Sequence, residues 1–507
     1  MGFSFVYAST LVGIKAIPVR VEADISKGLP RFTIVGLPDA AVSESRERVR
    51  SAMKNSELPF PRTAITINLA PADVRTQGPM YDLAIAMSIL GASEVIDNLK
   101  SMQRTLFLGE LALDGSIRPI RGVLLAALMA KVQGYESLIV SHDNAAEAAL
   151  VKGLQVCPAR SLLEVVSHFN SPSKLVPQPE TAFVGSDYLG EDMLHIRGQE
   201  QAKRALEVAA AGGHNLLMYG PPGSGKTMLA RALPSLLPGL SFEDMLEITA
   251  IHSVAGHLNE NGQLVRERPF RTPHHTASGI ALVGGGAWAK PGEISLAHRG
   301  VLFLDEFPEF SRQVLENLRQ PLEDGVVTVS RAAGTYEYPA RFMLVASMNP
   351  CPCGYLHDPK RECSCTPLQI TKYQQRISGP LLDRIDIVTE VPRVDIEKLS
   401  ALEPGESSET IRARILEARM CQRQRYAETP ITTNAELRSS SLQEHCQMNK
   451  DCLSLIKSAV DRLHLSARAY TRVLKVARTI ADLAGSTELA TTHLAEALQY
   501  RPKTLRS

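Results

Sequence analysis

The sequence predicts an α/β protein whose central domain is a parallel sheet built around a glycine-rich loop. Three apolar runs, at 215–219, 300–304 and 341–347, predict this fold class. The runs lead into the glycine-rich loop, into Asp305 and Glu306, and into Asn349 within two residues, which is typical of buried parallel strands whose carboxyl ends carry functional groups. A β-rich segment precedes this domain, and a helical segment follows it.

The first apolar run leads into the glycine-rich loop and then into a helix-forming stretch. Glycines let main-chain N–H groups approach phosphate oxygens, and the helix N-terminus adds a favourable dipole end for an anion. We expect Lys226 to reach the β- and γ-phosphates of ATP, and the Thr227 hydroxyl to ligate Mg²⁺. A chance glycine-rich turn would not combine every fixed position with both flanking elements. The loop consists of Gly220, Pro221, Pro222, Gly223, Ser224, Gly225, Lys226 and Thr227.

The other two strands end in residues suited to hydrolysis. Asp305 and Glu306 follow the run at 300–304. We expect Asp305 to hold Mg²⁺ through water and Glu306 to polarise the attacking water as general base. Asn349 follows the strand at 341–347, and we expect it to lie between the other two strands and help orient the hydrolytic water.

Composition excludes several classes of protein. The chain has 507 residues, of which 44% are hydrophobic and 21% charged, as in ordinary globular proteins of roughly two to four domains. No run approaches ~18 uninterrupted apolar residues, and residues 1–20 lack the pattern of a signal peptide. A cytoplasmic protein without a membrane partner is therefore expected. The net charge of +1 gives no bulk attraction to nucleic acid, so any such binding must come from a local basic surface.

Residues 1–170 predict a compact α+β domain. Runs rich in Val, Ile, Phe and Thr indicate strands, and Asp39 can cap a helix whose apolar positions have helical spacing. The expected strands are 3–12, 17–25, 31–35, 64–69 and 106–108, and the expected helices begin after Asp39 and cover 81–90 and 122–132.

This domain resembles the fold of Lon-type protease domains, a ribosomal S5 domain 2-like fold that also forms the last domain of the recombination factor RadA. The resembling stretches are 36–50, 77–79 and 109–122. Where Lon proteases carry a serine nucleophile and a lysine base, this sequence has Met80 and Leu124. Neither side chain can attack an amide, so we expect a proteolytically inactive Lon-like domain used for binding or assembly.

A proline-rich linker at 171–190 separates this domain from the nucleotide-binding core at 191–392, and residues 393–507 predict a helical lid. Residues 196–211 either pack on the adenine or form an ordinary surface helix. Lid helices are expected at 409–426, 453–463, 468–483 and 491–499.

Two segments that contain arginines resemble catalytic segments of ring-forming ATPase motors. The stretch 378–386 resembles the segment from which magnesium-chelatase motors and related replicative helicases send an arginine into the neighbouring subunit, which identifies Arg384 as an arginine finger. A salt bridge to Asp383 or Asp386 is the alternative. Arg468 resembles the sensor-2 residue that reaches the γ-phosphate, with Arg472 as second choice, unless both are solvent-facing helix charges.

Three further stretches, 271–278, 284–286 and 291–298, resemble the signature of the ComM/YifB family, magnesium-chelatase-like AAA+ proteins. This resemblance covers essentially the whole chain. It implies a homo-hexameric ATPase that uses ATP and Mg²⁺, binds single- and double-stranded DNA, and drives branch migration during natural transformation, with recombination proteins as further partners.

Two insertions in the core predict a threading pore. Residues 270–291 are rich in glycine, and 323–339 read as a hairpin. In a ring, Lys290 and Arg331 would meet DNA phosphates and Trp288 would stack on a base. The alternatives are a packed tryptophan and a solvated lysine.

The insertion at 351–365 contains four cysteines in two close pairs. In a reducing compartment, such thiolates are expected to hold structural Zn²⁺, with His357 as a substitute ligand; redox-active or unliganded cysteines are the alternative. The metal ligands expected are Cys351, Cys353, Cys363 and Cys365, and the cysteines expected to serve only packing are Cys157, Cys421, Cys446 and Cys452.

Two other functions fit the same core. A chelatase-like motor would act on a protein partner instead of DNA, and a nucleotide-gated scaffold would use ATP only to lock an assembly.

Overall fold

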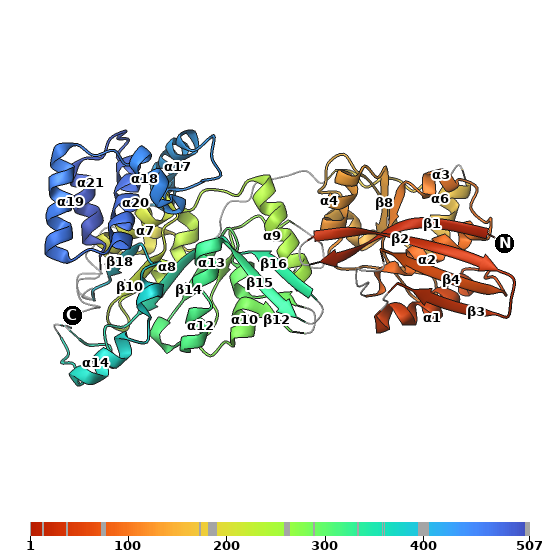
Figure 1. Ribbon diagram of the computed structural model, residues 1–507, viewed down its shortest axis with the longest axis horizontal. Coiled ribbons are helices and arrows are strands. Elements are labelled where there is room, and N and C mark those ends of the chain that lie inside the picture. Colours follow the sequence, from red (N-terminus) through yellow and green to blue (C-terminus); the bar gives the residue numbers. More distant parts are fainter. Residues whose placement is uncertain are drawn as a thin grey trace. The chain divides into compact units, whose positions relative to one another are not determined.

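A computed structural model describes residues 2–12, 15–36, 39–71, 78–171, 174–180, 190–257, 264–286, 289–331, 334–356, 358, 360–393 and 405–501 (Figure 1). The chain divides into two compact units. The first comprises Met1–Gly185, Phe242–Arg266 and Thr328–Tyr338, and the second comprises Ser186–Ser241, Glu267–Val327 and Pro339–Ser507. Residues 242–266 and 328–338, which we expected within the central core, thus group with the N-terminal residues. No helix in the described part of the chain is both long and apolar enough to cross a membrane.

The first unit is built on a seven-stranded mixed sheet with the order β3-β4-β2-β1-β5-β8-β9. The predicted strands are confirmed. The long β1–β2 hairpin and the β2–β4 pair are antiparallel, and the remaining pairs are parallel. The strands are β1 (Gly2–Val12), β2 (Lys15–Ser26), β3 (Arg31–Val35), β4 (Ala64–Ala70), β5 (Thr105–Phe107), β8 (Ser137–Ser141) and β9 (Gln155–Ala159), with a separate hairpin of β6 (Glu110–Leu111) and β7 (Ile117–Arg118).

Helices pack on this sheet through apolar side chains. The predicted cap of the first helix is confirmed, because Asp39 accepts a hydrogen bond from the Val42 N–H at 2.8 Å. The α2 helix is buried along its whole length and contacts β1 and β2. The helices are α1 (Ala40–Asn55), α2 (Asp82–Ala92), α3 (Leu99–Met102), α4 (Val123–Gln133), α5 (Ala145–Ala148), α6 (Leu162–Asn170) and α9 (Phe242–Ala255), with 3₁₀ turns η1 (Pro79–Tyr81) and η2 (His142–Asn144).

The α9 helix joins this unit through a buried polar contact. The Ser253 hydroxyl accepts a hydrogen bond from the Gly122 N–H (3.0 Å) and donates one to Glu147 (3.2 Å). Burial raises the pKa of the Glu147 carboxyl, since the charged form loses hydration. A chain segment that leaves the nucleotide-binding core therefore contributes a side chain to the interior of the N-terminal unit.

The second unit contains a five-stranded, fully parallel sheet with the order β11-β14-β17-β10-β18. The strand β17 lies between β10 and β14, as the prediction for Asn349 requires. Because parallel strands end at the same edge, the loops after β10, β14 and β17 meet there. The strands are β10 (Leu216–Tyr219), β11 (Phe270–Arg271), β14 (Val301–Leu304), β17 (Met343–Met348) and β18 (Ile387–Glu390).

Helices and one small hairpin complete the second unit. The hairpin predicted at 323–339 is confirmed as β15 (Val326–Arg331) paired with β16 (Gly334–Pro339), and its residues 328–338 group with the first unit. The other elements are α7 (Glu200–Gly212), α8 (Lys226–Leu236), α10 (Gly279–Val283), α11 (Glu293–Leu296), α12 (Arg312–Glu316), α13 (Arg319–Asp324), α14 (Pro367–Gln374), α15 (Gly379–Leu382), β12 (Gly284–Gly285), β13 (Lys290–Pro291), η3 (Met193–His195) and η4 (Phe307–Glu309).

The helical lid belongs to the same unit and shares its core with α7 and α8. All four predicted lid helices are confirmed, and α18 is an additional one. A buried His214 joins lid and sheet, because its Nε2 lies 2.8 Å from Thr479 Oγ1 and its Nδ1 lies 3.1 Å from Asp386. The lid elements are α17 (Ser408–Arg425), α18 (Ser439–His445), α19 (Lys450–Leu463), α20 (Ala467–Leu483), α21 (Thr491–Gln499) and η5 (Asn434–Glu436).

Candidate nucleotide-binding site

The glycine-rich loop lies between β10 and α8, and its geometry explains the glycines. Gly223 and Gly225 have φ values of +73° and +94°, a region that side chains disfavour. At Gly220 a Cβ atom would lie 2.1 Å from the carbonyl oxygen of Val391. The helix begins at Lys226, within the loop motif, so its first N–H groups, which have no partner inside the helix, are available to an anion.

Lys226 is buried, and its ammonium is held by uncharged oxygens. Nζ donates to the carbonyls of Gly220 (2.8 Å) and Pro221 (2.9 Å) and lies 3.4 Å from Asn349 Oδ1. Burial lowers the pKa of Lys226 to about 8, although the nearby charge of Asp305 acts in the opposite direction. A buried ammonium that contacts no carboxylate among the described residues is suited to an anionic ligand such as a polyphosphate.

Asp305 accepts hydrogen bonds from hydroxyl groups on two other elements. The Thr227 hydroxyl donates to Asp305 Oδ2 at 3.0 Å, and the Ser347 hydroxyl donates to Asp305 Oδ1. Carboxylate and hydroxyl oxygens are hard ligands, so Thr227 and Asp305 fit the predicted Mg²⁺. The sequence does not predict a role for Ser347. The one feature that could have indicated a role is its position next to the end of a buried strand, two residues before Asn349.

Glu306 has an unusual backbone and an unexpected partner. Its φ of 53° and ψ of 45° are left-handed, which costs about 1–3 kcal/mol for a residue with a side chain. Its carboxylate lies 3.3 Å from His275 Nδ1, and the His275 ring packs 4.2 Å from that of His274. His275 belongs to the signature stretch at 271–278, but no pattern in the sequence predicts that it lies beside Glu306.

These groups line one cavity of 380 Å³. Three strand ends supply its polar groups, so the structure brings together the predicted loop, Asp305, Glu306 and Asn349. The lining residues are Pro222, Gly223, Ser224, Gly225, Lys226, Thr227, Met228, Asp305, Glu306, Ser347, Met348 and Asn349.

The predicted arginines Arg384 and Arg468 are not among the residues that line this cavity. Arg384 forms an ion pair with Glu323 and donates to the Pro380 carbonyl at 2.8 Å, and its side chain is 16% exposed. The ion pair described for Arg384 is thus with Glu323, whereas the alternative predicted Asp383 or Asp386 as its partner. Arg468 is exposed and lies 3.6 Å from Asp383, so in this chain it is placed beside the Arg384 segment instead of beside the glycine-rich loop.

The four cysteines predicted to hold a metal form one cluster. All four sulfur atoms lie within 4.8 Å of one another. The distances from Cys351 to Cys353 and Cys363 are 3.3 and 3.6 Å, and Cys353 and Cys363 are 3.6 Å apart. A tetrahedral zinc site with Zn–S bonds near 2.3 Å implies sulfur separations of about 3.8 Å, so this donor set fits Zn²⁺.

Of the other cysteines, Cys157, Cys446 and Cys452 are buried, as predicted. Cys421 is exposed, and its predicted packing role is wrong, because it lies on the solvent side of α17. The substitute ligand His357 lies outside the described residues.

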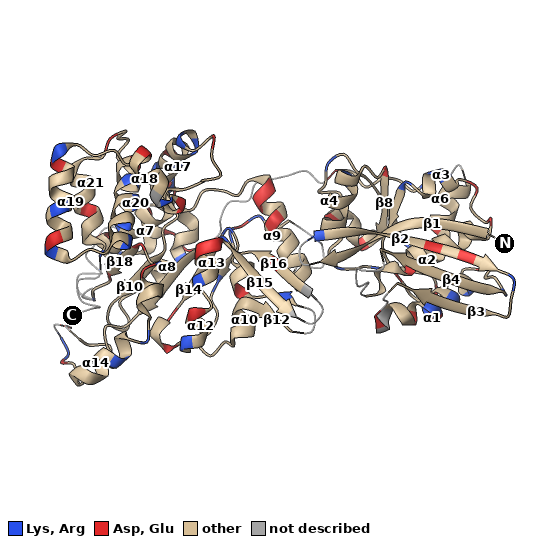
Figure 2. Cartoon of the chain, viewed as in Figure 1, with Lys and Arg blue, Asp and Glu red and all other residues tan. Residues whose placement is uncertain are grey.

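Of the predicted pore residues, the structure describes the Lys290 side chain, which is exposed on β13. Arg331 ends strand β15, but its side chain lies outside the description, as does Trp288. Basic and acidic side chains are interspersed along α12, α13 and α19 (Figure 2), in keeping with the small net charge.

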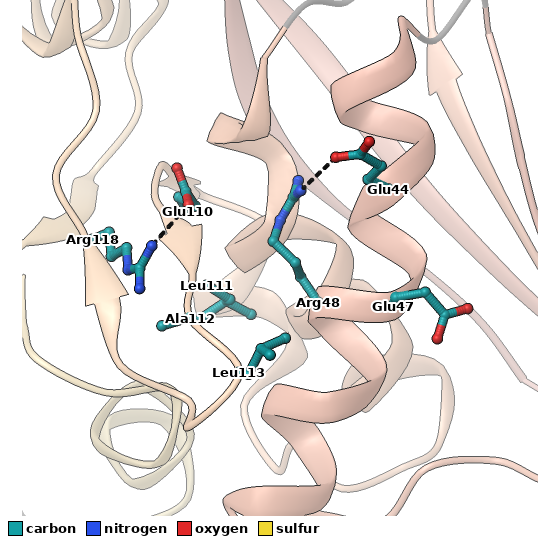
Figure 3. A pocket seen from close by; sticks show the side chains of 8 residues that line it. All are labelled: Glu44, Glu47, Arg48, Glu110, Leu111, Ala112, Leu113 and Arg118. Carbon is teal, nitrogen blue, oxygen red and sulfur yellow. Dashed lines mark ion pairs between the residues drawn. The ribbon is translucent and has the colours of Figure 1, made fainter.

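The N-terminal unit carries a separate cavity of 490 Å³ beside α1 and the β6–β7 hairpin (Figure 3). Its arginines are paired, because Arg48 donates to the buried Asp82 at 2.6 Å and Arg118 lies 3.6 Å from Glu110. None of the eight residues described around it carries a hydroxyl, thiol or amine that could act as a nucleophile. They are Glu44, Glu47, Arg48, Glu110, Leu111, Ala112, Leu113 and Arg118.

The positions at which we predicted no proteolytic chemistry are Met80 and Leu124. Both side chains are buried, with 7% and 0% of their surface exposed. They pack in the interior of the unit and present no reactive group to a substrate.

Comparison with known proteins gives matches over most of the chain. Three family models match: "Magnesium chelatase, subunit ChlI" over residues 192–399, "Subunit ChlI of Mg-chelatase" over 21–144 and "Magnesium chelatase, subunit ChlI C-terminal" over 405–501. The competence protein ComM of Haemophilus influenzae is 45% identical over 99% of this chain and 98% of its own length. The uncharacterized protein YifB of Escherichia coli is 45% identical over 99% and 97%. The magnesium-chelatase 38 kDa subunit of Cereibacter sphaeroides is 26% identical over 44% of this chain and 70% of its own length.

Proposed function

Because this chain belongs to the ComM/YifB family of magnesium-chelatase-like AAA+ proteins, we propose that it is an ATPase that forms a hexameric ring and drives branch migration of DNA. One observation carries the ATPase: a single cavity gathers Lys226, Thr227, Asp305, Glu306 and Asn349 from three strand ends. The name of the ComM relative refers to competence, which supports a role in integrating DNA during natural transformation.

The cavity supplies the groups that bind the phosphates and activate water. Lys226 and the loop N–H groups bind the β- and γ-phosphates, and a Mg²⁺ ion held by Thr227 and Asp305 would neutralise charge on the phosphate oxygens. Glu306 accepts a proton from water while the water oxygen forms a bond to the γ-phosphorus and the bond to the β-phosphate oxygen breaks. Asn349 orients this water. The products are ADP and phosphate.

The site is completed by a second subunit. Arg384 does not line the cavity of its own chain, yet a γ-phosphate needs a cation to stabilise charge in the transition state. We assign Arg384 as the finger that enters the neighbour's cavity, which makes the ring a requirement of catalysis. DNA would pass through its centre, where Lys290, Arg331 and Trp288 are the proposed contacts.

A branch-migration assay on a three-strand DNA junction with ATP tests this function. The wild type is expected to resolve the junction and to hydrolyse ATP faster with DNA, while Glu306→Gln binds ATP without doing either. ATP turnover that DNA does not stimulate would contradict the DNA function and favour a chelatase-like motor acting on a protein partner. ATP binding without turnover by the wild type would contradict the motor and favour a nucleotide-gated scaffold.

We also propose structural Zn²⁺ at the four-cysteine cluster. Protein purified without chelator is expected to contain one zinc per chain, and replacing both Cys351 and Cys363 by Ser should remove it and lower thermal stability. The control is Cys421→Ser, which changes an exposed cysteine outside the cluster. Zinc-free wild-type protein would contradict the site.

For the N-terminal unit we propose a Lon-like domain without protease activity. The buried Met80 and Leu124 support this, as does the absence of a hydroxyl, thiol or amine from the residues described around its cavity. ATP-dependent hydrolysis of casein by the purified protein would contradict it.

A further inference from the structure

The segment that carries Arg384 is fixed mainly by main-chain contacts. Arg384 lies between the end of α15 at Leu382 and the start of β18 at Ile387. Its carbonyl accepts a hydrogen bond from Asn215 Nδ2 at 2.9 Å, and its N–H donates to the Leu381 carbonyl at 3.0 Å. The orientation of the Arg384 side chain therefore depends on the position of the short stretch between Leu382 and Ile387.

A lid residue, Arg472 of α20, holds this stretch on both sides of Arg384. Its Nη1 donates to the carbonyls of Leu382 (2.9 Å) and Ile385 (2.7 Å), and its Nη2 donates to Asp383 Oδ1 at 3.3 Å. The guanidinium group is planar and presents its donors in a fixed fork, so three simultaneous acceptors define its position closely. The side chain is 18% exposed, which also limits its movement.

These contacts argue against a role for Arg472 in sensing the γ-phosphate. The sequence offered it as second choice, after Arg468, for the residue that reaches the γ-phosphate. In the structure it is not among the residues that line the nucleotide cavity, and Nη1 donates to two main-chain carbonyls. A guanidinium that donates to these carbonyls fixes the position of the main chain around Arg384.

The same lid helix reaches the far end of the stretch through a second contact. Thr479, two turns after Arg472 on α20, lies 2.8 Å from His214 Nε2, and His214 Nδ1 lies 3.1 Å from Asp386. Residues 382–386 are thus connected to α20 at both ends. A shift of α20 would displace the stretch, because both connections are short and largely buried.

We propose that Arg472 is a positioning residue for Arg384, through which the lid of one subunit sets the arginine that completes the active site of its neighbour. This inference rests on the proposed function, because it requires the shared site. The proposal states which active site depends on Arg472: the neighbour's cavity, and not the cavity of its own chain.

Mixed rings test this direction. In the parent mixture, subunits carrying Arg384→Ala keep their cavity, and subunits carrying Lys226→Ala keep their finger. An interface is complete where the Lys226→Ala subunit supplies its finger to the cavity of the Arg384→Ala subunit, so ATP turnover is expected to recover partly on mixing. Arg472→Ala is then added either to the Lys226→Ala subunit, which supplies the finger, or to the Arg384→Ala subunit, which supplies the cavity.

We expect Arg472→Ala to lower the recovered turnover about tenfold or more when it is in the finger-supplying subunit, since displacing a catalytic group by about 1 Å can cost 10²-fold. In the cavity-supplying subunit it should change turnover less than about twofold, the same as the exposed control Arg462→Ala in either subunit. The opposite asymmetry, or equal losses in both subunits, would overturn the inference.

A structural defect in the lid would reduce turnover from both positions, so the asymmetry separates positioning from folding. If Arg472→Ala does not fold, Arg472→Lys serves in its place, because a single ammonium cannot reproduce the three-acceptor fork. A parent mixture without recovery would contradict the shared site and the inference with it, whereas recovery without asymmetry contradicts the inference alone.

Discussion

The nucleotide cavity and the Arg384 segment are two halves of one proposed site, and they differ in how their groups are held. In the cavity, Lys226 donates to the carbonyl of Gly220, and Thr227 donates to Asp305. These residues lie within a few positions of strand ends. In the other half, Arg384 is paired with Glu323 on α13, and its main chain is held by the lid. The first half is prepared for a ligand, and Arg384 in the second half is not among the residues described around the nucleotide cavity of its own chain.

This difference indicates how turnover is controlled. A preorganised cavity binds nucleotide in an isolated chain, because its donors need no further partner. In the proposed mechanism, Arg384 exchanges Glu323 for a phosphate bound to another subunit before it acts. Nucleotide binding should therefore survive changes to the second half, while hydrolysis should not.

Arg384→Ala gives the largest expected effect. Without the finger, ATP turnover should fall about 10³-fold, because arginine fingers contribute about 10³–10⁵ to phosphoryl transfer. The affinity for ATP, measured by calorimetry, should stay within about threefold of the wild type. A loss of affinity equal to the loss of turnover would place Arg384 in its own chain's cavity.

Glu306→Gln should lower turnover about 10²-fold or more, since general-base catalysis contributes about 10²–10⁴. The amide keeps the shape of the side chain but cannot accept the proton from water. Single-turnover hydrolysis at saturating ATP measures this step. Wild-type turnover in the variant would mean that another group is the base.

Affinity for ATP should decrease as the pH rises above about 8. Burial lowers the pKa of Lys226 to about 8, and phosphates bind its protonated form, so binding is constant below this pH and weakens by up to about tenfold per unit above it. Titrations between pH 7 and about 9.5 measure this. Lys226→Arg is the control, because a guanidinium stays charged; an equal decrease in that variant would contradict the role of Lys226 titration.

Glu323→Gln should give the smallest effect, an increase in turnover of about two- to fivefold. Glu323 is 64% exposed, and an ion pair with one exposed partner contributes no more than about 1 kcal/mol. Removing it lowers the cost of moving Arg384 into the neighbour's site. Glu316→Gln is a matched control, because Glu316 pairs with Arg319 instead. Reduced turnover in Glu323→Gln alone would mean that the pair supports the active position of Arg384.

Much of the fold followed from local patterns. The strand, loop and helix around 220–227, the hairpin at 323–339 and four lid helices all have signals within a few residues, namely glycine positions, alternation and helical spacing. Grouping residues 242–266 with the N-terminal unit had no such signal. It depends on contacts such as that between Ser253 and Glu147, which are 106 positions apart.

The chemistry of the nucleotide cavity was encoded in the chain as motifs, because each phosphate- or metal-binding group occupies a fixed position next to a strand end. The contacts of Glu306 with His275, of Arg384 with Glu323 and of Arg472 with Leu382 were not encoded in this way. The last pair is 90 positions apart, and folding brings it together. Motifs identify side chains that are suited to bind a nucleotide, and packing determines which of them line the cavity and which contact the segment that carries Arg384.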